Sequence, residues 1–167
     1  YGAVISTYPS TNALTVTNLD ANGGNATLNV VIQGASDPFN HSVDLDLNGH
    51  DLGVVRFKNS ERSVNALTVP AAWLVEGENT LTFTSTGGDD DVSLVESVQI
   101  TYPHKFTADG NALQFNVPAA TAVTIGGFTT ANVRVVDLTD PQAPQFLATS
   151  VATTGGSTSV SFATEGI

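Results

Sequence analysis

The sequence predicts an all-β chain built as an antiparallel β-sandwich, and two observations point to this class. Apolar and polar residues alternate with a period of two in many short segments, as they do in strands that bury one face. Turn signals such as Asn48-Gly49 and Gly87-Gly88 separate these segments at short intervals. Many short strands joined by tight turns are typical of sandwiches and barrels rather than of parallel α/β sheets.

The expected strands follow one another along almost the whole chain. The alternation is clearest where Val43 and Leu45 lie on one face of a strand and Asp44 and Asp46 on the other. One helical turn is expected at 70–75, because proline suits the first turn of a helix. The expected strands are residues 12–17, 25–34, 41–47, 52–58, 63–69, 79–85, 92–102, 113–117, 122–125, 132–138, 146–151 and 158–162.

A domain boundary is expected near Pro103. A proline cannot extend a central β-ladder, and the segments after it are shorter and richer in Ala and Thr. We therefore expect a main sandwich over residues 1–104 and a small β unit over residues 105–167 that packs on it. A single continuous sandwich is the alternative.

Composition and charge exclude several classes of function. The net charge is −11 with only five Lys and Arg residues, so binding to the phosphate backbone of a nucleic acid is not expected. No apolar run is long enough to enter a membrane. The chain has no Cys, which excludes disulfides, thiolate metal sites and a Cys nucleophile.

The origin of the chain is also suggested by composition. Charged residues make up 13% of the chain and Thr, Ser and Asn supply most of its polarity, as in many bacterial surface and secreted β proteins. The chain has no Met. We expect an exported, extracellular or cell-surface location, and a processed chain or a piece of a larger protein.

Two distinctive motifs occur in the first two thirds of the chain. The letters L-N-G at 47–49 are followed by L-G at 52–53, and V-P at 69–70 is followed by L-x-x-G-x-N-x-L-x-F at 74–83. This pattern resembles the jelly-roll domains of the galactose-binding-like type. The resemblance implies a jelly-roll-type antiparallel β-sandwich followed by a smaller β unit.

Two later motifs narrow the resemblance. They are V-Q-I-T-Y-P-H-K at 98–105 and V-D-L-T-D-P at 136–141. With the jelly roll, they resemble the β-rich region that precedes the catalytic domain in gingipain-type cysteine peptidases, over about residues 25–147. That family often has Arg close to the position of Lys105, so this part of the match is approximate. The resemblance implies a non-catalytic neighbour of a peptidase domain, because the Cys nucleophile is absent.

No catalytic residues are predicted. The histidines are expected in exposed or loop positions, with His41 at a strand start and His50 at a hairpin tip. No nucleophile-elbow pattern accompanies them, and a catalytic triad needs a nucleophile, a base and an acid held together. Asp44 and Asp46 lie about 7 Å apart on one strand, a separation that glycosidases also use. A solvated strand face is the better interpretation, because the chain has one Trp and three Tyr to line a cleft.

The sequence contains two candidate binding sites. Asp89, Asp90 and Asp91 form an acidic loop that is the best metal candidate, since Ca²⁺ prefers oxygen ligands. Consecutive aspartates point in different directions, so a solvated acidic loop is the default interpretation and Ca²⁺ the alternative to it. We expect that no cofactor is required. Trp73 is the candidate for stacking on a sugar ring, although its apolar neighbours Leu74 and Val75 favour packing in the core.

Two functional hypotheses follow from the sequence. The first is a non-catalytic accessory or interaction domain whose partner is a neighbouring catalytic domain of the same polypeptide, most simply a cysteine peptidase. The second is a carbohydrate-binding module whose partner is a glycan. The first depends on the absent Cys and the motif at 136–141, and the second depends on the jelly-roll pattern.

The Ca²⁺ hypothesis predicts a change in thermal stability. A ligand that binds only the folded state stabilises it, so the thermal midpoint is expected to rise with added Ca²⁺ and to fall with a chelator. Differential scanning calorimetry of the metal-stripped chain at increasing Ca²⁺ measures this. An unchanged midpoint at millimolar Ca²⁺ contradicts the hypothesis.

Overall fold

The structure, a computed structural model, describes residues 2–164. Tyr1 and residues 165–167 lie outside the described part. The chain divides into two compact units with a boundary between His104 and Lys105. Both units are built from antiparallel β-strands, and the described residues form no α-helix. The prediction of an all-β chain with a sandwich is confirmed.

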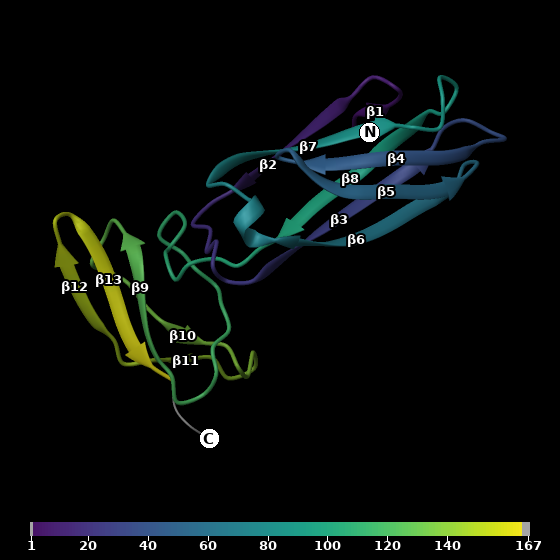
Figure 1. Cartoon of the computed structure of the whole chain (residues 1–167). Helices are drawn as coiled ribbons and strands as arrows, with labels where there is room; N and C mark the ends of the chain where they lie inside the picture. The colour runs from purple at the N-terminus through teal and green to yellow at the C-terminus, as the bar shows by residue number, and fades with distance from the viewer. Residues whose placement is uncertain (1, 165–167) are drawn as a thin grey trace. The chain divides into compact units, whose positions relative to one another are not determined.

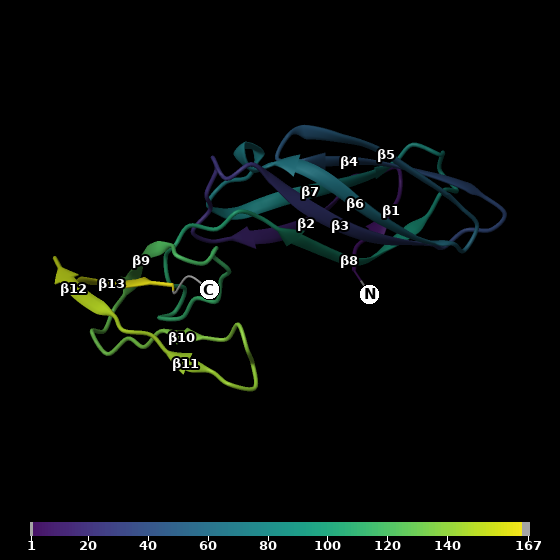
Figure 2. The ribbon, with the colours of Figure 1, turned by 90° about the horizontal axis from the view of Figure 1, so that it is seen from below.

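The first unit is a sandwich of two four-stranded antiparallel sheets (Figure 1). One sheet has the strand order β1–β8–β3–β6 and the other β2–β7–β4–β5. Figure 2 shows the same two layers from below. Most neighbouring strands are not consecutive in sequence, as expected for jelly-roll-type connections. The strands are β1 (Val4–Ile5), β2 (Ser10–Val16), β3 (Asn25–Gly34), β4 (Asn40–Leu47), β5 (His50–Lys58), β6 (Arg62–Pro70), β7 (Gly77–Ser85) and β8 (Ser93–Thr101).

The core of the first unit is made by the inner faces of its strands. Burial alternates along β4, so that every second side chain from His41 to Leu47 is buried. This alternation is the period of two that a pleated strand imposes. The buried hydrophobic residues of this core are Ile5, Val16, Leu19, Ala26, Leu28, Val30, Ile32, Val43, Leu45, Leu47, Val55, Phe57, Val69, Ala71, Leu74, Leu81, Phe83 and Val95.

Local signals in the first unit have the expected structural effect. Asn48 and Gly49 both have positive φ, at 54° and 85°, and Leu47 pairs with His50 across them. This is the two-residue hairpin turn that an Asn-Gly pair favours. The expected helical turn is present as one 3₁₀ turn, η1 (Ala71–Trp73). No helix among residues 2–164 has the length and apolarity to span a membrane.

The second unit contains two small sheets. β9 (Ala122–Phe128), β12 (Ser150–Thr154) and β13 (Ser157–Ala163) form one in the order β12–β13–β9. β10 (Val136–Asp137) and β11 (Gln145–Phe146) form the other. Its buried core is Ala108, Val123, Ile125, Phe128, Val160 and Phe162.

The expected strands of the second unit are only partly present. Residues 113–117 form no strand, although Leu113, Phe115 and Val117 pack against the core of this unit. Their alternation reflects partial burial of every second side chain without a hydrogen-bonded neighbour strand. The expected strand at 132–138 is reduced to β10, and the one at 146–151 is interrupted between β11 and β12.

The buried side chain of Asn79 fixes the start of β7 through hydrogen bonds. Asn79 is fully buried, and its Oδ1 accepts hydrogen bonds from the Val75 amide and the Asn48 Nδ2, both at 2.8 Å. Its Nδ2 donates to the carbonyl oxygens of Val75 at 2.9 Å and Gly77 at 3.2 Å. The Asn79 amide therefore joins the turn after η1 to the β4–β5 hairpin.

Removal of this amide is expected to destabilise the first unit. Asn79→Ala removes the side-chain partner of the Val75 amide and carbonyl and one of the two acceptors of the Asn48 Nδ2, at a cost of about 2 kcal/mol in the free energy of unfolding. Urea unfolding measures this cost. Thr80→Ala is the matched control, because Thr80 is exposed on the same strand and should change stability by less than about 0.5 kcal/mol. Equal effects of the two variants would contradict the role of Asn79.

Candidate functional site

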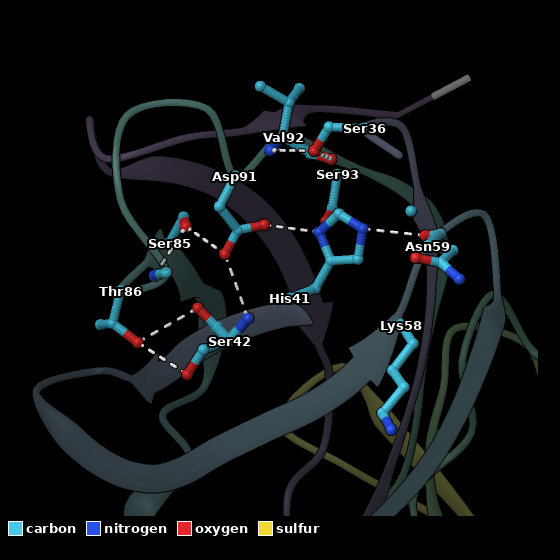
Figure 3. A network of polar contacts seen from close by, with 12 residues as sticks. Ser36, His41, Ser42, Lys58, Asn59, Ser85, Thr86, Asp91, Val92 and Ser93 are labelled. Atoms are coloured by element: carbon cyan, nitrogen blue, oxygen red, sulfur yellow. Dashed lines mark hydrogen bonds and ion pairs between the residues drawn. The ribbon is translucent and has the colours of Figure 1, made fainter. Parts of the chain in front are cut away.

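The most organised polar cluster in the first unit surrounds His41 at the start of β4 (Figure 3). His41 is 1% exposed and occupies the same face of β4 as Val43 and Leu45. Its ring stacks on Phe57 of β5, with centroids 4.7 Å apart, because the two residues are cross-strand partners. The expectation of an exposed histidine is wrong here, since the alternation of β4 turns this position toward the core.

Asp91 is the main partner of His41. The His41 Nδ1 lies 2.5 Å from the Asp91 Oδ1, and both side chains are fully buried. The second carboxylate oxygen of Asp91 accepts hydrogen bonds from the Ser85 hydroxyl at 2.7 Å and from the Ser42 amide at 3.1 Å. Ser93 places its hydroxyl 3.2 Å from the same His41 nitrogen. Asp91 therefore joins the end of β7 to the starts of β4 and β8.

The hydrogen bonds define how many protons the pair holds. The His41 Nε2 lies 2.8 Å from the Asn59 carbonyl oxygen, which only accepts, so Nε2 carries a proton. A second proton must lie between His41 Nδ1 and Asp91 Oδ1, because two bare acceptors would repel each other at 2.5 Å. With two protons the His41–Asp91 pair has no net charge, which makes its burial tolerable.

The environment also favours the ionised form of Asp91. Burial raises the pKa of this carboxyl, but hydrogen bonds from Ser85, Ser42 and His41 outweigh burial and hold the pKa below its usual value. The backbone approaches closely as well, since a side chain at Gly87 would collide with the Asp91 carboxylate. The cluster is therefore packed as well as hydrogen-bonded.

This arrangement does not suit catalysis. A general base needs a free ring nitrogen within reach of a substrate proton. Both ring nitrogens of His41 are engaged, and the side chain has no exposed surface. The cluster instead fixes the loop that enters β8. Asp91 belongs to this loop, and the Ser36 hydroxyl binds the backbone amide and carbonyl of Val92 next to it.

The structure does not bring the three aspartates of the acidic loop together. Asp89 and Asp90 are exposed, whereas Asp91 is buried with His41. Within residues 2–164 no three His, Asp or Glu side chains form a group that could hold a metal ion. A cation that used all three aspartates would have to separate Asp91 from His41, and Ca²⁺ binding stays a prediction.

Trp73, the sugar-binding candidate, is half-buried at the end of η1. It packs against the core of the first unit, and His50 stacks on it with the ring planes 7° apart and the centroids separated by 4.5 Å. Its backbone carbonyl accepts a hydrogen bond from Asn48. The ring face that His50 covers is not open to a sugar in this conformation.

The burial of His41 could be predicted from the sequence, but its pairing with Asp91 could not. His41 has the same parity as Val43 and Leu45, so strict alternation would have placed it in the core. Asp91 has the same parity as Val95, but nothing in the three-aspartate loop distinguishes Asp91 from its neighbours. Their contact spans 50 positions and depends on the fold.

Comparisons with known proteins give structural neighbours only. No family model matches the chain, and no curated protein does. Among solved structures, dimeric latent PorU from Porphyromonas gingivalis aligns with 99% of this chain at a TM-score of 0.61 and 11% identity. The chain spans 17% of that PorU chain. At this identity the match shows a shared fold.

Two carbohydrate-binding modules match less well. The module CBM36 in complex with calcium and xylotriose covers 59% of the chain at a TM-score of 0.44 and 15% identity, and the alignment spans 78% of that module. The CBM36-1 domain of a multidomain xylanase from the hindgut metagenome of Trinervitermes trinervoides covers 61%, at a TM-score of 0.45 and 12% identity, and 78% of that domain is aligned.

The Asp91 network predicts a specific loss of stability in acid. The folded-state pKa of Asp91 lies below its unfolded value of about 3.9, so its contribution is complete above that pH and is lost as the pH falls through the folded pKa. Asp91→Asn should cost about 3–5 kcal/mol at pH 7, because it removes one partner of a buried pair. Its stability should then fall less steeply than the parent's below about pH 4.

Urea midpoints between pH 7 and pH 2.5 measure both effects. Asp90→Asn is the matched control, because Asp90 is an exposed neighbour in the same loop and should unfold like the parent. If Asp91→Asn and Asp90→Asn behave alike, the buried pair does not stabilise the sandwich.

Proposed function

We propose that this chain is a non-catalytic interaction region of a larger exported bacterial protein, and that it adjoins and supports a cysteine peptidase domain of the same polypeptide. Its role is one of position and contact rather than of chemistry. No catalytic residue is assigned, and the location outside the cell is part of the proposal.

The supporting observation is the extent of the match to PorU. The alignment covers 99% of this chain, so both units take part in it, yet it spans only 17% of the other chain. A pair of units that recurs inside a much longer chain is suited to work next to other domains. The sequence resemblance at 98–105 and 136–141 to the region before gingipain-type catalytic domains supports the same role.

The physical design of the first unit also supports a scaffold. Its organised polar clusters, around Asn79 and around His41 with Asp91, are buried and saturated with internal hydrogen bonds. Such clusters fix the ends of strands and loops. A rigid sandwich of this kind suits the positioning of a neighbouring domain.

The parent protein provides the decisive test. We expect its gene to encode a domain with a Cys nucleophile and a His base after residue 167, and we expect the longer chain, but not the 167-residue chain, to hydrolyse peptides. A Cys→Ser variant of that nucleophile should abolish hydrolysis. Deletion of residues 1–167 should lower the thermal midpoint of the catalytic domain. A parent gene without any catalytic domain on the C-terminal side would overturn the proposal.

Carbohydrate binding is the second candidate, and it makes a different prediction. It requires His50 to move off Trp73 so that a sugar ring can stack there. A glycan array followed by titration of the parent and of Trp73→Ala tests this candidate. Saturable binding that Trp73→Ala abolishes would favour the module over the interaction region, and absence of binding at millimolar sugar would exclude it.

A further inference from the structure

The β10–β11 hairpin of the second unit is a small but well-defined structure. Val136 pairs with Phe146, and the Leu147 amide extends the ladder by donating to the Val135 carbonyl at 3.0 Å. Asp137 shapes the loop, since its Oδ1 accepts hydrogen bonds from both the amide and the hydroxyl of Thr139, at 2.8 and 2.6 Å. These bonds lower the pKa of Asp137, so it stays ionised and keeps the turn.

One face of this hairpin exposes large apolar side chains. Phe146 is 72% exposed and Val136 40%, and as directly opposite residues they lie on the same face. Leu138, two residues after Val136, is 54% exposed. Single exposed hydrophobic residues are common, but a contiguous group on one short ladder is typical of a contact surface.

A groove adjoins this face. It has a volume of about 330 Å³ and is lined by Val133, Arg134, Val135, Phe146, Leu147 and Thr149. This volume is at the lower end of the range of ligand pockets, so the groove can hold a few side chains of a partner but not the flat surface of a domain.

Arg134 is the charged element of the groove. Its side chain is exposed, and it makes no hydrogen bond or ion pair with any residue in the described range 2–164. By contrast, Arg62 of the first unit is held by Glu96 through two hydrogen bonds, at 2.5 and 2.8 Å. A guanidinium beside apolar side chains provides a docking point for a carboxylate, which it can bind through two parallel hydrogen bonds.

We propose that the groove beside β10 and β11 binds a short extended segment of a protein partner that carries one carboxylate flanked by apolar side chains. Arg134 pairs with the carboxylate, and Phe146, the exposed apolar residue of the groove lining, contacts the apolar side chains. The inference rests on the proposed function, because it names the contact through which an interaction region would hold its partner. A second copy of this chain is the less suitable occupant, since each copy carries a net charge of −11.

Nuclear magnetic resonance tests this proposal with a defined probe. The ¹⁵N-labelled 167-residue chain is titrated with the blocked peptide acetyl-Val-Thr-Glu-Val-Thr-amide and with the same peptide carrying Lys in place of Glu. We expect amide shifts confined to residues 133–135 and 146–149 with the Glu peptide, and binding at least tenfold weaker with the Lys peptide. Arg134→Glu should reverse this preference, and Phe146→Ser should weaken binding of both peptides.

The controls separate charge at the groove from charge elsewhere. Arg56→Glu changes an exposed arginine of β5 in the first unit and should leave peptide binding unchanged. Absence of shifts at millimolar peptide, shifts outside the groove, or an unchanged preference in Arg134→Glu would overturn the inference. Concentration-dependent shifts of the groove residues without peptide would also overturn it, in favour of self-association. None of these results changes what the parent gene encodes, so the proposed function is tested separately.

Discussion

The first unit depends on one constraint, the burial of the inner faces of two antiparallel sheets against each other. The constraint explains why Val43, Leu45 and Leu47 alternate with polar residues on β4, and why β3 and β7 supply buried residues at every second position. With no Cys in the chain, no disulfide assists this packing. The dominant contribution to stability is the apolar area that the two faces remove from water.

The same constraint determines how polar groups inside the sandwich are arranged. Asn79 lies near the beginning of β7, and Ser85, which binds Asp91, lies at its end, about 20 Å away along the strand. At both places the buried polar atoms are matched by internal partners, since an unpaired polar group would cost more than the contact gains. The His41–Asp91 pair satisfies this rule because both ring nitrogens of His41 have partners, Nδ1 in Asp91 and Nε2 in the Asn59 carbonyl.

Sequence reasoning succeeded where the period of two and the turn residues act locally. The strand at 25–34 has the predicted bounds, and Asn48-Gly49 forms the expected hairpin turn, because both signals lie within a few residues. It failed at 113–117, where alternating apolar residues are partly buried without a partner strand. The site could not be predicted, because the contact between Asp91 and His41 depends on how the fold brings β4 and the start of β8 together. In the sequence, Asp91 also cannot be distinguished from Asp89 and Asp90, which are exposed.

The two units differ in where they place their apolar residues, and this difference bears on function. The first unit buries a continuous core contributed by both of its sheets, and its organised polar clusters are satisfied internally. Among its described residues, 105–164, the second unit has a core of six buried hydrophobic residues and leaves Val136, Leu138 and Phe146 exposed beside Arg134, which has no partner in the described range. A small β unit gains stability when such a face is covered. In the proposed function, the sandwich holds position and the second unit makes the contact.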